Sequence, residues 1–370
     1  MLKKKFFFTK LIPVSIILVC VAVISRFFIE PFKFPVNIDD CLYSALLQNN
    51  SIWKLMQMLS GKYNGIYIAH FDGRMFSNFY SLLVFSILKT HHSIYYLYDL
   101  FIFLILVASL YFLFTALIKK GVISSLDFSK KLLLSFFVSC SLFIFLIDGR
   151  YEVFYWVSGI SNHLLSIIFF IFTLALFIGK RSFLNSLLIS LLSFCLGQMN
   201  EVYALSYFFI FLFIAIALPA TRVSFIIMLV MVFVSLFINL SAYGTAVRFN
   251  TLYSISTHFN FASSLKDTAD TFWLPFINFR YLPIKIPVII LVFFTIRDYL
   301  KIQIYISTKH LLYFNRLLLL AALMSVFLHC YILGEICTYR GLLFYCLSLL
   351  YFIFIMASKN IVNPLRLFFK

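Results

Sequence analysis

The sequence predicts an all-α integral membrane protein, a single polytopic domain over residues 1–370 with about ten transmembrane helices. Two observations predict this fold class. The chain is 63% hydrophobic and 12% charged, whereas soluble domains carry about 25% charged residues. Its apolar stretches are long and continuous instead of alternating, which favours membrane-spanning helices over a β-barrel.

A hydrocarbon core about 30 Å thick needs about 20 apolar residues in a helix. The sequence predicts spans at residues 11–29, 94–118, 132–147, 163–179, 183–197, 204–220, 223–240, 285–296, 311–333 and 341–357. No small-residue cleavage site follows the first run, so we expect a retained helix instead of a signal peptide. The seven cysteines form no CxxC pair and no Cys/His cluster, which disfavours disulfide frameworks and structural zinc.

Charge sets the expected orientation. The apolar run 76–88 reaches only about 20 Å as a helix, so we expect it to lie along the interface as a juxtamembrane helix. With that choice, 18 of the 30 basic residues fall in short cytoplasmic segments, as the positive-inside rule requires. If 76–88 crossed the membrane instead, every later segment would change sides.

This topology makes both termini cytoplasmic and gives two long outer loops, 30–93 and 241–284. Within the first loop, 41–47 and 52–59 are candidates for further short helices. The net charge of +17 is then explained by orientation, and nucleic acid is not an expected partner.

Ten of the 13 acidic residues fall in outer loops under this topology. They are Glu30, Asp39, Asp40, Asp72, Asp148, Glu152, Glu201, Asp267, Asp270 and Glu335. Carboxylates contribute little to orientation, so this sorting needs another cause. A polar active site on the outer face would supply one.

Asp39 and Asp40 directly follow the first span and open a run with helical character. A carboxylate held at this depth suits a general base that takes the proton of an acceptor hydroxyl. The alternative is a helix N-cap, which aspartate also suits. From this pair alone, the N-cap is the favoured interpretation.

The arginines of the outer loops include Arg74, Arg150, Arg248 and Arg340. A guanidinium group matches the geometry of phosphate, so together they are candidates for holding a polyprenyl phosphate at headgroup level. Local pairing with aspartate or interfacial anchoring is the alternative for each one. No HxxxH, HExxH or DxD motif stands in an outer loop, so no metal site is predicted.

Further candidates for substrate binding lie in three outer connections. Glu152, Trp156 and Asn162 belong to a loop of aromatic and hydrogen-bonding groups, which suits sugar rings but is also typical of an aromatic belt. Glu201 stands in a very short connection, where an uncompensated charge costs about 2.5–3.5 kcal/mol. It is a functional candidate or, alternatively, the partner of an outer-face arginine. Glu335 lies between the last two spans.

In this order along the chain, these residues resemble the motifs of GT-C-type polytopic bacterial glycosyltransferases, close to the serotype-converting O-antigen glucosyltransferases and their relatives. The matching motifs are Asp39-Asp40, Gly73-Arg74, Trp156-x-x-Gly159-x-x-Asn162, Asn200-Glu201, Ala242-x-Gly244-x-x-x-Arg248 and Arg340. Two positions depart from the family pattern. Tyr243-Gly244-Thr245 stands where related chains often have Pro-Gly-Asn, and Cys41 stands where an aromatic residue is common.

The resemblance implies an inverting transfer of a hexose, glucose by expectation, that needs neither a metal nor a cofactor. The donor would be an undecaprenyl-phosphate sugar and the acceptor a lipid-linked O-antigen or similar glycan, at the periplasmic face of the bacterial inner membrane. The implied base is Asp40 or Asp39, with Asp40 favoured. The four arginines would hold the donor phosphate, and Glu201 would orient the donor or the base.

Two other functions are open on the sequence. A flippase or transporter of lipid-linked saccharides would be expected to carry ionisable residues at mid-membrane, and here the spans carry few beyond Asp99. An O-antigen polymerase or ligase would concentrate its arginines in one large outer loop.

Overall fold

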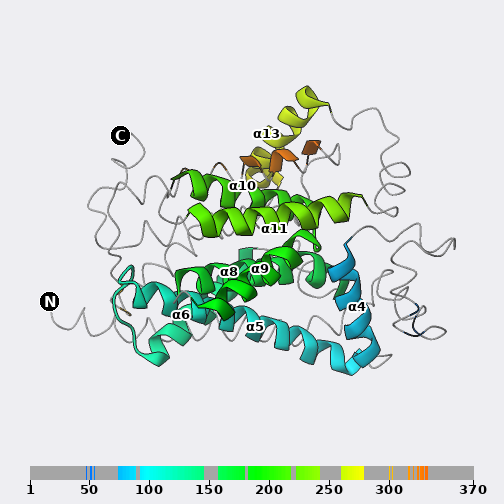
Figure 1. The fold of residues 1–370 in the computed structure, drawn as a ribbon. Coiled ribbons are helices and arrows are strands. Elements are labelled where there is room, and N and C mark those ends of the chain that lie inside the picture. The colour runs from blue at the N-terminus through cyan, green and yellow to red at the C-terminus, as the bar shows by residue number, and fades with distance from the viewer. Residues whose placement is uncertain are drawn as a thin grey trace.

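The computed structural model describes residues 74–88, 92–145, 157–179, 182–217, 222–241 and 260–278, with isolated positions at 47, 51 and 54 and between 300 and 331. Its elements in these ranges are helices (Figure 1). They are α4 (Met75–Leu88), α5 (His92–Lys119), α6 (Phe128–Phe145), α7 (Val157–Gly159), the π-helix η3 (Ile160–Leu164), α8 (Leu165–Ile178), α9 (Phe183–Gly197), α10 (Glu201–Ala217), α11 (Arg222–Leu240) and α13 (Phe261–Asn278).

The all-α prediction is therefore confirmed for the described residues. Six predicted spans coincide with helices, and these are α5, α6, η3 with α8, α9, α10 and α11. The short run 76–88 is helix α4. The predicted spans 11–29, 285–296 and 341–357 lie outside the described residues, as do most positions of 311–333, 41–47 and 52–59.

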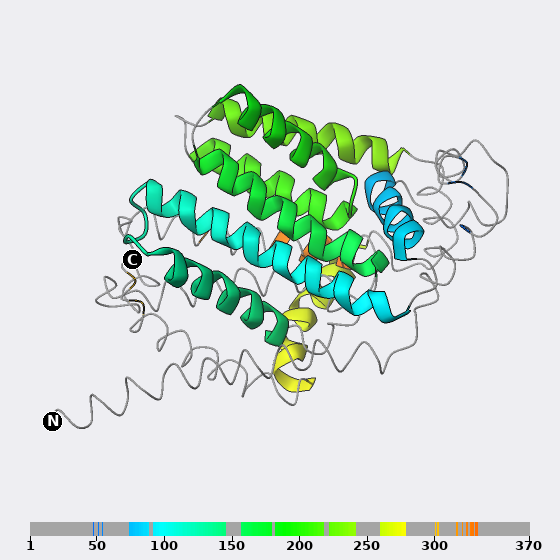
Figure 2. The ribbon, with the colours of Figure 1, turned by 90° about the horizontal axis from the view of Figure 1, so that it is seen from below.

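The helices α5, α6, α8, α9, α10 and α11 form a bundle in which successive helices run in opposite directions (Figures 1 and 2). Helix α5 packs against α6 and α8, α8 also packs against α9, and α11 packs against both α9 and α10. Helix α4 lies across one end of this bundle and contacts α5, α7 and η3 (Figure 1). That α4 runs along a membrane surface stays a prediction.

Large apolar side chains lie both inside the bundle and on its outer surface. Leu106 and Met228 are fully buried, whereas Phe183 is 87% exposed and Phe237 is 65% exposed. A bundle in water carries polar residues at its outer positions, whereas lipid favours apolar residues there. Two described helices are long and apolar enough to cross a membrane, Leu97–Lys119 with 23 residues and Ile160–Ile178 with 19 residues.

Hydroxyl groups inside the helices donate hydrogen bonds to carbonyls of their own helix. Ser135 donates to the carbonyl of Lys131 at 2.8 Å, and Ser139 donates to that of Ser135 at 2.9 Å. Thr173 donates in the same way to Phe169 at 2.8 Å. Because these bonds satisfy the hydroxyls without water, such residues are compatible with a hydrocarbon environment.

Helices α9 and α11 approach each other closely at Gly197. A Cβ atom added there would lie 2.6 Å from the Cβ atom of Ser235 and 2.8 Å from the carbonyl oxygen of Val232, which is shorter than real Cβ contacts. Ser235 also donates a hydrogen bond to the carbonyl of Phe194. The absence of a side chain at Gly197 therefore lets α11 pack against the end of α9, directly before the turn that leads into α10.

We expect Gly197→Ala to lower the free energy of unfolding by about 1–3 kcal/mol, because the added methyl group overpacks this contact. Thermal unfolding of the purified full-length protein in detergent, followed by circular dichroism, measures the change. Adding Ser235→Gly removes the nearest atom and should restore part of the loss. Ser186→Ala, at an exposed position of α9, is the matched control, and an equal effect of the two alanine variants would contradict the prediction.

Candidate functional site

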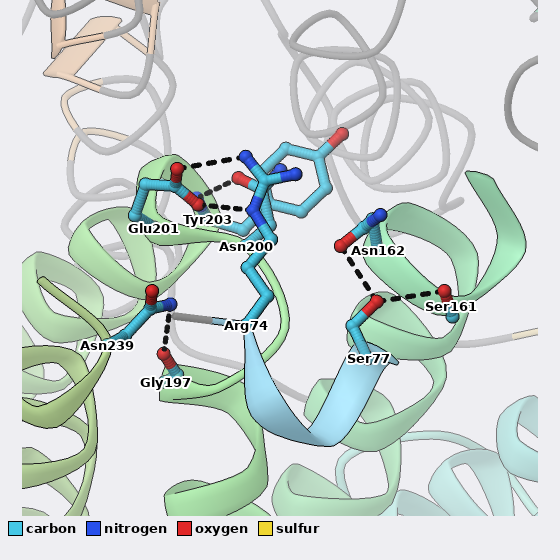
Figure 3. Close-up of polar contacts among 9 residues, drawn as sticks. All are labelled: Arg74, Ser77, Ser161, Asn162, Gly197, Asn200, Glu201, Tyr203 and Asn239. Atoms are coloured by element: carbon cyan, nitrogen blue, oxygen red, sulfur yellow. Dashed lines mark hydrogen bonds and ion pairs between the residues drawn. The ribbon is translucent and has the colours of Figure 1, made fainter. Parts of the chain in front are cut away.

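Three connections meet at the end of the bundle where α4 lies. They are the start of α4, the π-helix η3 and the turn between α9 and α10 (Figure 3). Arg74, Asn162 and Glu201, which the sequence singles out separately, come from these three connections. The structure brings them to one region of the protein.

Arg74 and Glu201 form a bidentate ion pair across 127 positions of sequence. The Nε atom of Arg74 donates to Oε2 of Glu201 at 2.6 Å, and Nη2 donates to Oε1 at 2.9 Å (Figure 3). The side chains are only 14% and 7% exposed. Paired, charge-assisted bonds of this kind are among the strongest in proteins and fix the plane of the guanidinium group. Of the alternatives for Glu201, pairing with an arginine is observed.

The local fold also favours a negative charge at Glu201. Asn200 caps α10, since its Oδ1 atom accepts a hydrogen bond from the backbone N–H of Tyr203 at 3.2 Å. Its carbonyl accepts from the N–H of Ala204 at 2.8 Å. Glu201 is the first residue of this helix, where unpaired N–H groups and the helix dipole stabilise an anion.

A chain of hydroxyl and amide groups fastens α4 to η3. The Oγ atom of Ser77 lies 2.8 Å from Oγ of Ser161 and 2.8 Å from Oδ1 of Asn162 (Figure 3). Ser81, one turn further along α4, lies 2.9 Å from the same Ser161 hydroxyl. Because a hydroxyl carries one proton, both bonds of Ser77 can form together only if Ser161 donates to it. Asn162 is thereby held in one orientation.

The π-helix that carries Asn162 also packs against α10. The ring of His163 meets the ring of Tyr203 edge to face, with centroids 5.5 Å apart. One turn deeper, Ser166 donates to the hydroxyl of Tyr207 at 3.3 Å. Short π-helical segments are frequent at functional sites, because the extra residue shifts which side chains face a given side. Here the segment directs Ser161 towards α4 and His163 towards α10.

Helix α11 holds the turn between α9 and α10 from its other side. Gln198 donates from Nε2 to the carbonyl of Ser235 at 2.6 Å. Asn239 donates from Nδ2 to the carbonyl of Gly197 at 3.2 Å (Figure 3). The side chain of Gln198 is buried. The turn that presents Glu201 is therefore a fixed part of the scaffold.

A hydrogen bond between two tyrosine hydroxyls ties α4 to α5. The hydroxyl of Tyr98 donates to that of Tyr80 at 3.2 Å. Burial raises the pKa of Tyr80, and the hydrogen bond from Tyr98 partly opposes this shift. Tyr80 thus stays a neutral hydroxyl through the physiological range.

The remaining predicted site residues lie outside the described part of the chain. They are Asp39, Asp40, Arg150, Glu152, Trp156, Arg248, Glu335 and Arg340. Among the residues that are described, no three of the types His, Cys, Asp and Glu lie close enough together to hold a metal ion.

The serines that join α4 to η3 were not singled out from sequence, and they are Ser77, Ser81 and Ser161. A signal exists for the first two, because serines four positions apart share one face of a helix. Ser161 offered no comparable signal, since the π-helical shift that aims it at α4 leaves no mark in the hydrophobic pattern.

The described groups are suited to recognition more than to proton transfer. Arg74 and Asn162 are held in fixed orientations, as hydrogen-bonding groups for phosphates or sugar hydroxyls need. Both carboxylate oxygens of Glu201 accept hydrogen bonds from Arg74. These two bonds commit the Glu201 carboxylate to positioning Arg74.

We expect Arg74→Gln to lower the free energy of unfolding by about 3 kcal/mol, because it leaves the buried Glu201 carboxylate without its cation. The double variant Arg74→Gln/Glu201→Gln should lose much less than the sum of the two single variants. Thermal unfolding of the full-length protein completes this double-mutant cycle. The exposed pair Asp127 and Lys130 is the matched control, where little coupling is expected. Additive effects at Arg74 and Glu201 would contradict the prediction.

No protein-family model, curated protein or solved structure was found to match this chain.

Proposed function

We propose that the protein is a polytopic membrane glycosyltransferase that moves a hexose, in our proposal glucose, from undecaprenyl phosphate to a lipid-linked O-antigen or similar glycan. The observation that carries the proposal is the meeting of Arg74, Asn162 and Glu201 at one end of the bundle (Figure 3). Each belongs to a motif on which the resemblance to GT-C-type enzymes rests. Apolar residues would pack this end at a lower desolvation cost, so the polar groups favour a role in ligand binding.

In the proposed reaction, an oxygen of the acceptor bonds to the anomeric carbon of the sugar as the bond from that carbon to the phosphate oxygen breaks. The proton of the acceptor hydroxyl passes to Asp40 or Asp39. Polyprenyl phosphate leaves with an additional negative charge, which arginine side chains stabilise. The proposal assigns this task to Arg74, Arg150, Arg248 and Arg340, with no metal ion required.

The geometry supports orienting roles for Glu201 and Ser77. Glu201 fixes the plane of the Arg74 guanidinium group through two short hydrogen bonds. Ser77 fixes the carbonyl side of the Asn162 amide, so its NH₂ group is presented in a defined direction. In the proposal, Asn162 binds the sugar together with Glu152, Trp156 and Glu335.

We further propose that this end faces the periplasm of a bacterial inner membrane, in a topology of ten spans with both termini in the cytoplasm. The distribution of charge supports this orientation. Lys119, Lys120, Lys130 and Lys131 gather at the connection between α5 and α6, at the end of the bundle opposite to α4 (Figures 1 and 2). Basic connections of this kind stay on the cytoplasmic side.

Reporter fusions test the topology. A fusion after residue 90 should be active only with a periplasmic reporter, and a fusion after residue 125 only with a cytoplasmic one, because α5 would separate the two positions. Alkaline phosphatase and green fluorescent protein report the two sides. The reverse pattern would mean that α4 crosses the membrane and would remove the proposed site from the periplasm.

Transfer activity tests the reaction. Membranes that contain the protein should move labelled sugar from undecaprenyl-phosphate glucose to the lipid-linked glycan. Asp40→Asn should lower the rate by about 100-fold or more if it removes the general base, and Asp39→Asn should have the smaller effect. Asp127→Asn, a carboxylate at the opposite end of the bundle, is the matched control and should leave the rate unchanged.

The products separate the proposal from its rivals. Mass spectrometry of the surface polysaccharide should show a side-branch hexose only when the protein is present. A change in chain length without a branch would indicate a polymerase. Glycan that crosses the membrane without a new glycosidic bond would indicate a transporter. Intact transfer in both Asp39→Asn and Asp40→Asn would refute the proposed base.

A further inference from the structure

The connection between α5 and α6 concentrates positive charge at one end of the bundle. We call residues 119–131 the basic hairpin. It contains Lys119, Lys120, Lys130 and Lys131 and a single acidic residue, Asp127. Asp127 lies 3.4 Å from the ammonium group of Lys130. The other three lysines leave the hairpin with an excess of positive charge.

Both ends of the basic hairpin have a defined backbone geometry. Gly121 adopts a left-handed conformation with φ of 69°. Its N–H donates to the carbonyl of Ile118, and the N–H of Val122 donates to that of Leu117, both at 2.9 Å. These two bonds close α5 with the glycine-dependent cap that is common at helix ends. Lys119 and Lys120 therefore lie at the capped end of α5, where the backbone is held by hydrogen bonds.

The start of α6 is capped as well. The Oδ1 atom of Asp127 accepts a hydrogen bond from the backbone N–H of Lys130 at 2.8 Å. This bond is the main cause of the lowered pKa of Asp127. Between the two caps, Ile123 and Leu126 are buried against the bundle. The four lysines are thus displayed from a rigid turn.

An aromatic group lies beside these charges. The ammonium group of Lys131 lies 4.9 Å from the ring centroid of Tyr111 on α5. The ring of Phe128 packs against the same tyrosine, with centroids 5.7 Å apart. Phe128 is nonetheless 65% exposed. The basic hairpin therefore presents an apolar ring directly next to its ammonium groups.

The position of the hairpin matches the depth of lipid phosphates. The apolar helix Leu97–Lys119 is long enough to cross a membrane and ends at the first of the four lysines. Residues directly after such a helix lie at the headgroup level, where the phosphates are. An exposed phenylalanine at this level reaches acyl chains, whereas it would be of no use towards a soluble polyanion.

We propose that the basic hairpin binds the phosphate groups of anionic phospholipids, with Phe128 inserted among their acyl chains. Orientation in the membrane requires only basic residues in a short connection, which a flexible loop also supplies. Two caps, two buried anchors and an oriented aromatic ring give the lysines a fixed arrangement in addition. The proposal is independent of the proposed glycosyl transfer, because the hairpin lies at the other end of the bundle.

A fluorescence experiment tests the proposal. The full-length variant Phe128→Trp is placed in nanodiscs of phosphatidylcholine and phosphatidylglycerol, with bromine on the acyl chains of one lipid at a time. After subtraction of wild-type quenching, brominated phosphatidylglycerol should quench the introduced indole more than brominated phosphatidylcholine at equal mole fraction. Adding Lys119→Gln and Lys120→Gln should reduce this preference by about five-fold for each lysine, given about 1 kcal/mol per lysine near an anionic surface.

Matched variants complete the design. Lys119→Arg with Lys120→Arg keeps the charge and should keep the preference. Lys266→Gln, which removes an exposed lysine of α13, should not change it. The glutamine variants leave Lys130 and Lys131 to orient the protein. Equal quenching by the two lipids, or an unchanged preference in the glutamine variants, would overturn the proposal.

Discussion

The bidentate ion pair between Arg74 and Glu201 is the constraint on which the arrangement of this bundle end depends. It links the residue before α4 to the first residue of α10, and both side chains are largely buried. Removing two charges from water is costly, and only well-aligned hydrogen bonds offset the cost. The pair therefore contributes geometry more than stability. It selects one position for α4, because any other position would leave a buried charge without its partner.

The serine contacts hold α4 at a second place along its length. Ser77 and Ser81 meet Ser161 one turn apart, so a shift of α4 along its own axis would break the serine bonds and the ion pair together. Two sets of contacts at different heights on one helix fix its position along its own axis. On the opposite side, the turn that carries Glu201 is clamped by Gln198 and Asn239. Rigid elements of this kind hold recognition groups within the tolerance that binding requires.

Much of the helical architecture could be predicted from sequence, because long apolar runs leave few alternatives. The differences at the helix ends have local causes. Helix α6 begins at Phe128 instead of residue 132, since Asp127 caps it and its first-turn lysines project outward. Helix α10 begins at Glu201 instead of residue 204, since Asn200 caps it. Hydropathy places apolar segments, but a cap extends a helix into polar residues that hydropathy assigns to a loop.

The contacts of the site were less accessible to prediction. From the sequence, pairing with an outer-face arginine was one of two interpretations of Glu201, and the sequence did not choose among the arginines of the outer loops. The choice of Arg74 goes together with the way α4 lies across the bundle, where the ion pair and the hydroxyl contacts with a π-helix hold this helix jointly. Neither feature alters composition or periodicity, which are the properties that sequence patterns report.

The charge balance of the ion pair also refines the proposed reaction. Arg74 and Glu201 together are neutral, so the pair adds little net attraction for a phosphate that gains negative charge as it leaves. In the proposed scheme, net positive charge must then come from Arg150, Arg248 and Arg340. Arg74 acts instead as a hydrogen-bond donor whose plane Glu201 fixes. Under this scheme, loss of Glu201 would misorient the hydrogen-bonding guanidinium group of Arg74. Loss of Arg150, Arg248 or Arg340 would instead weaken the electrostatic stabilisation of the leaving phosphate.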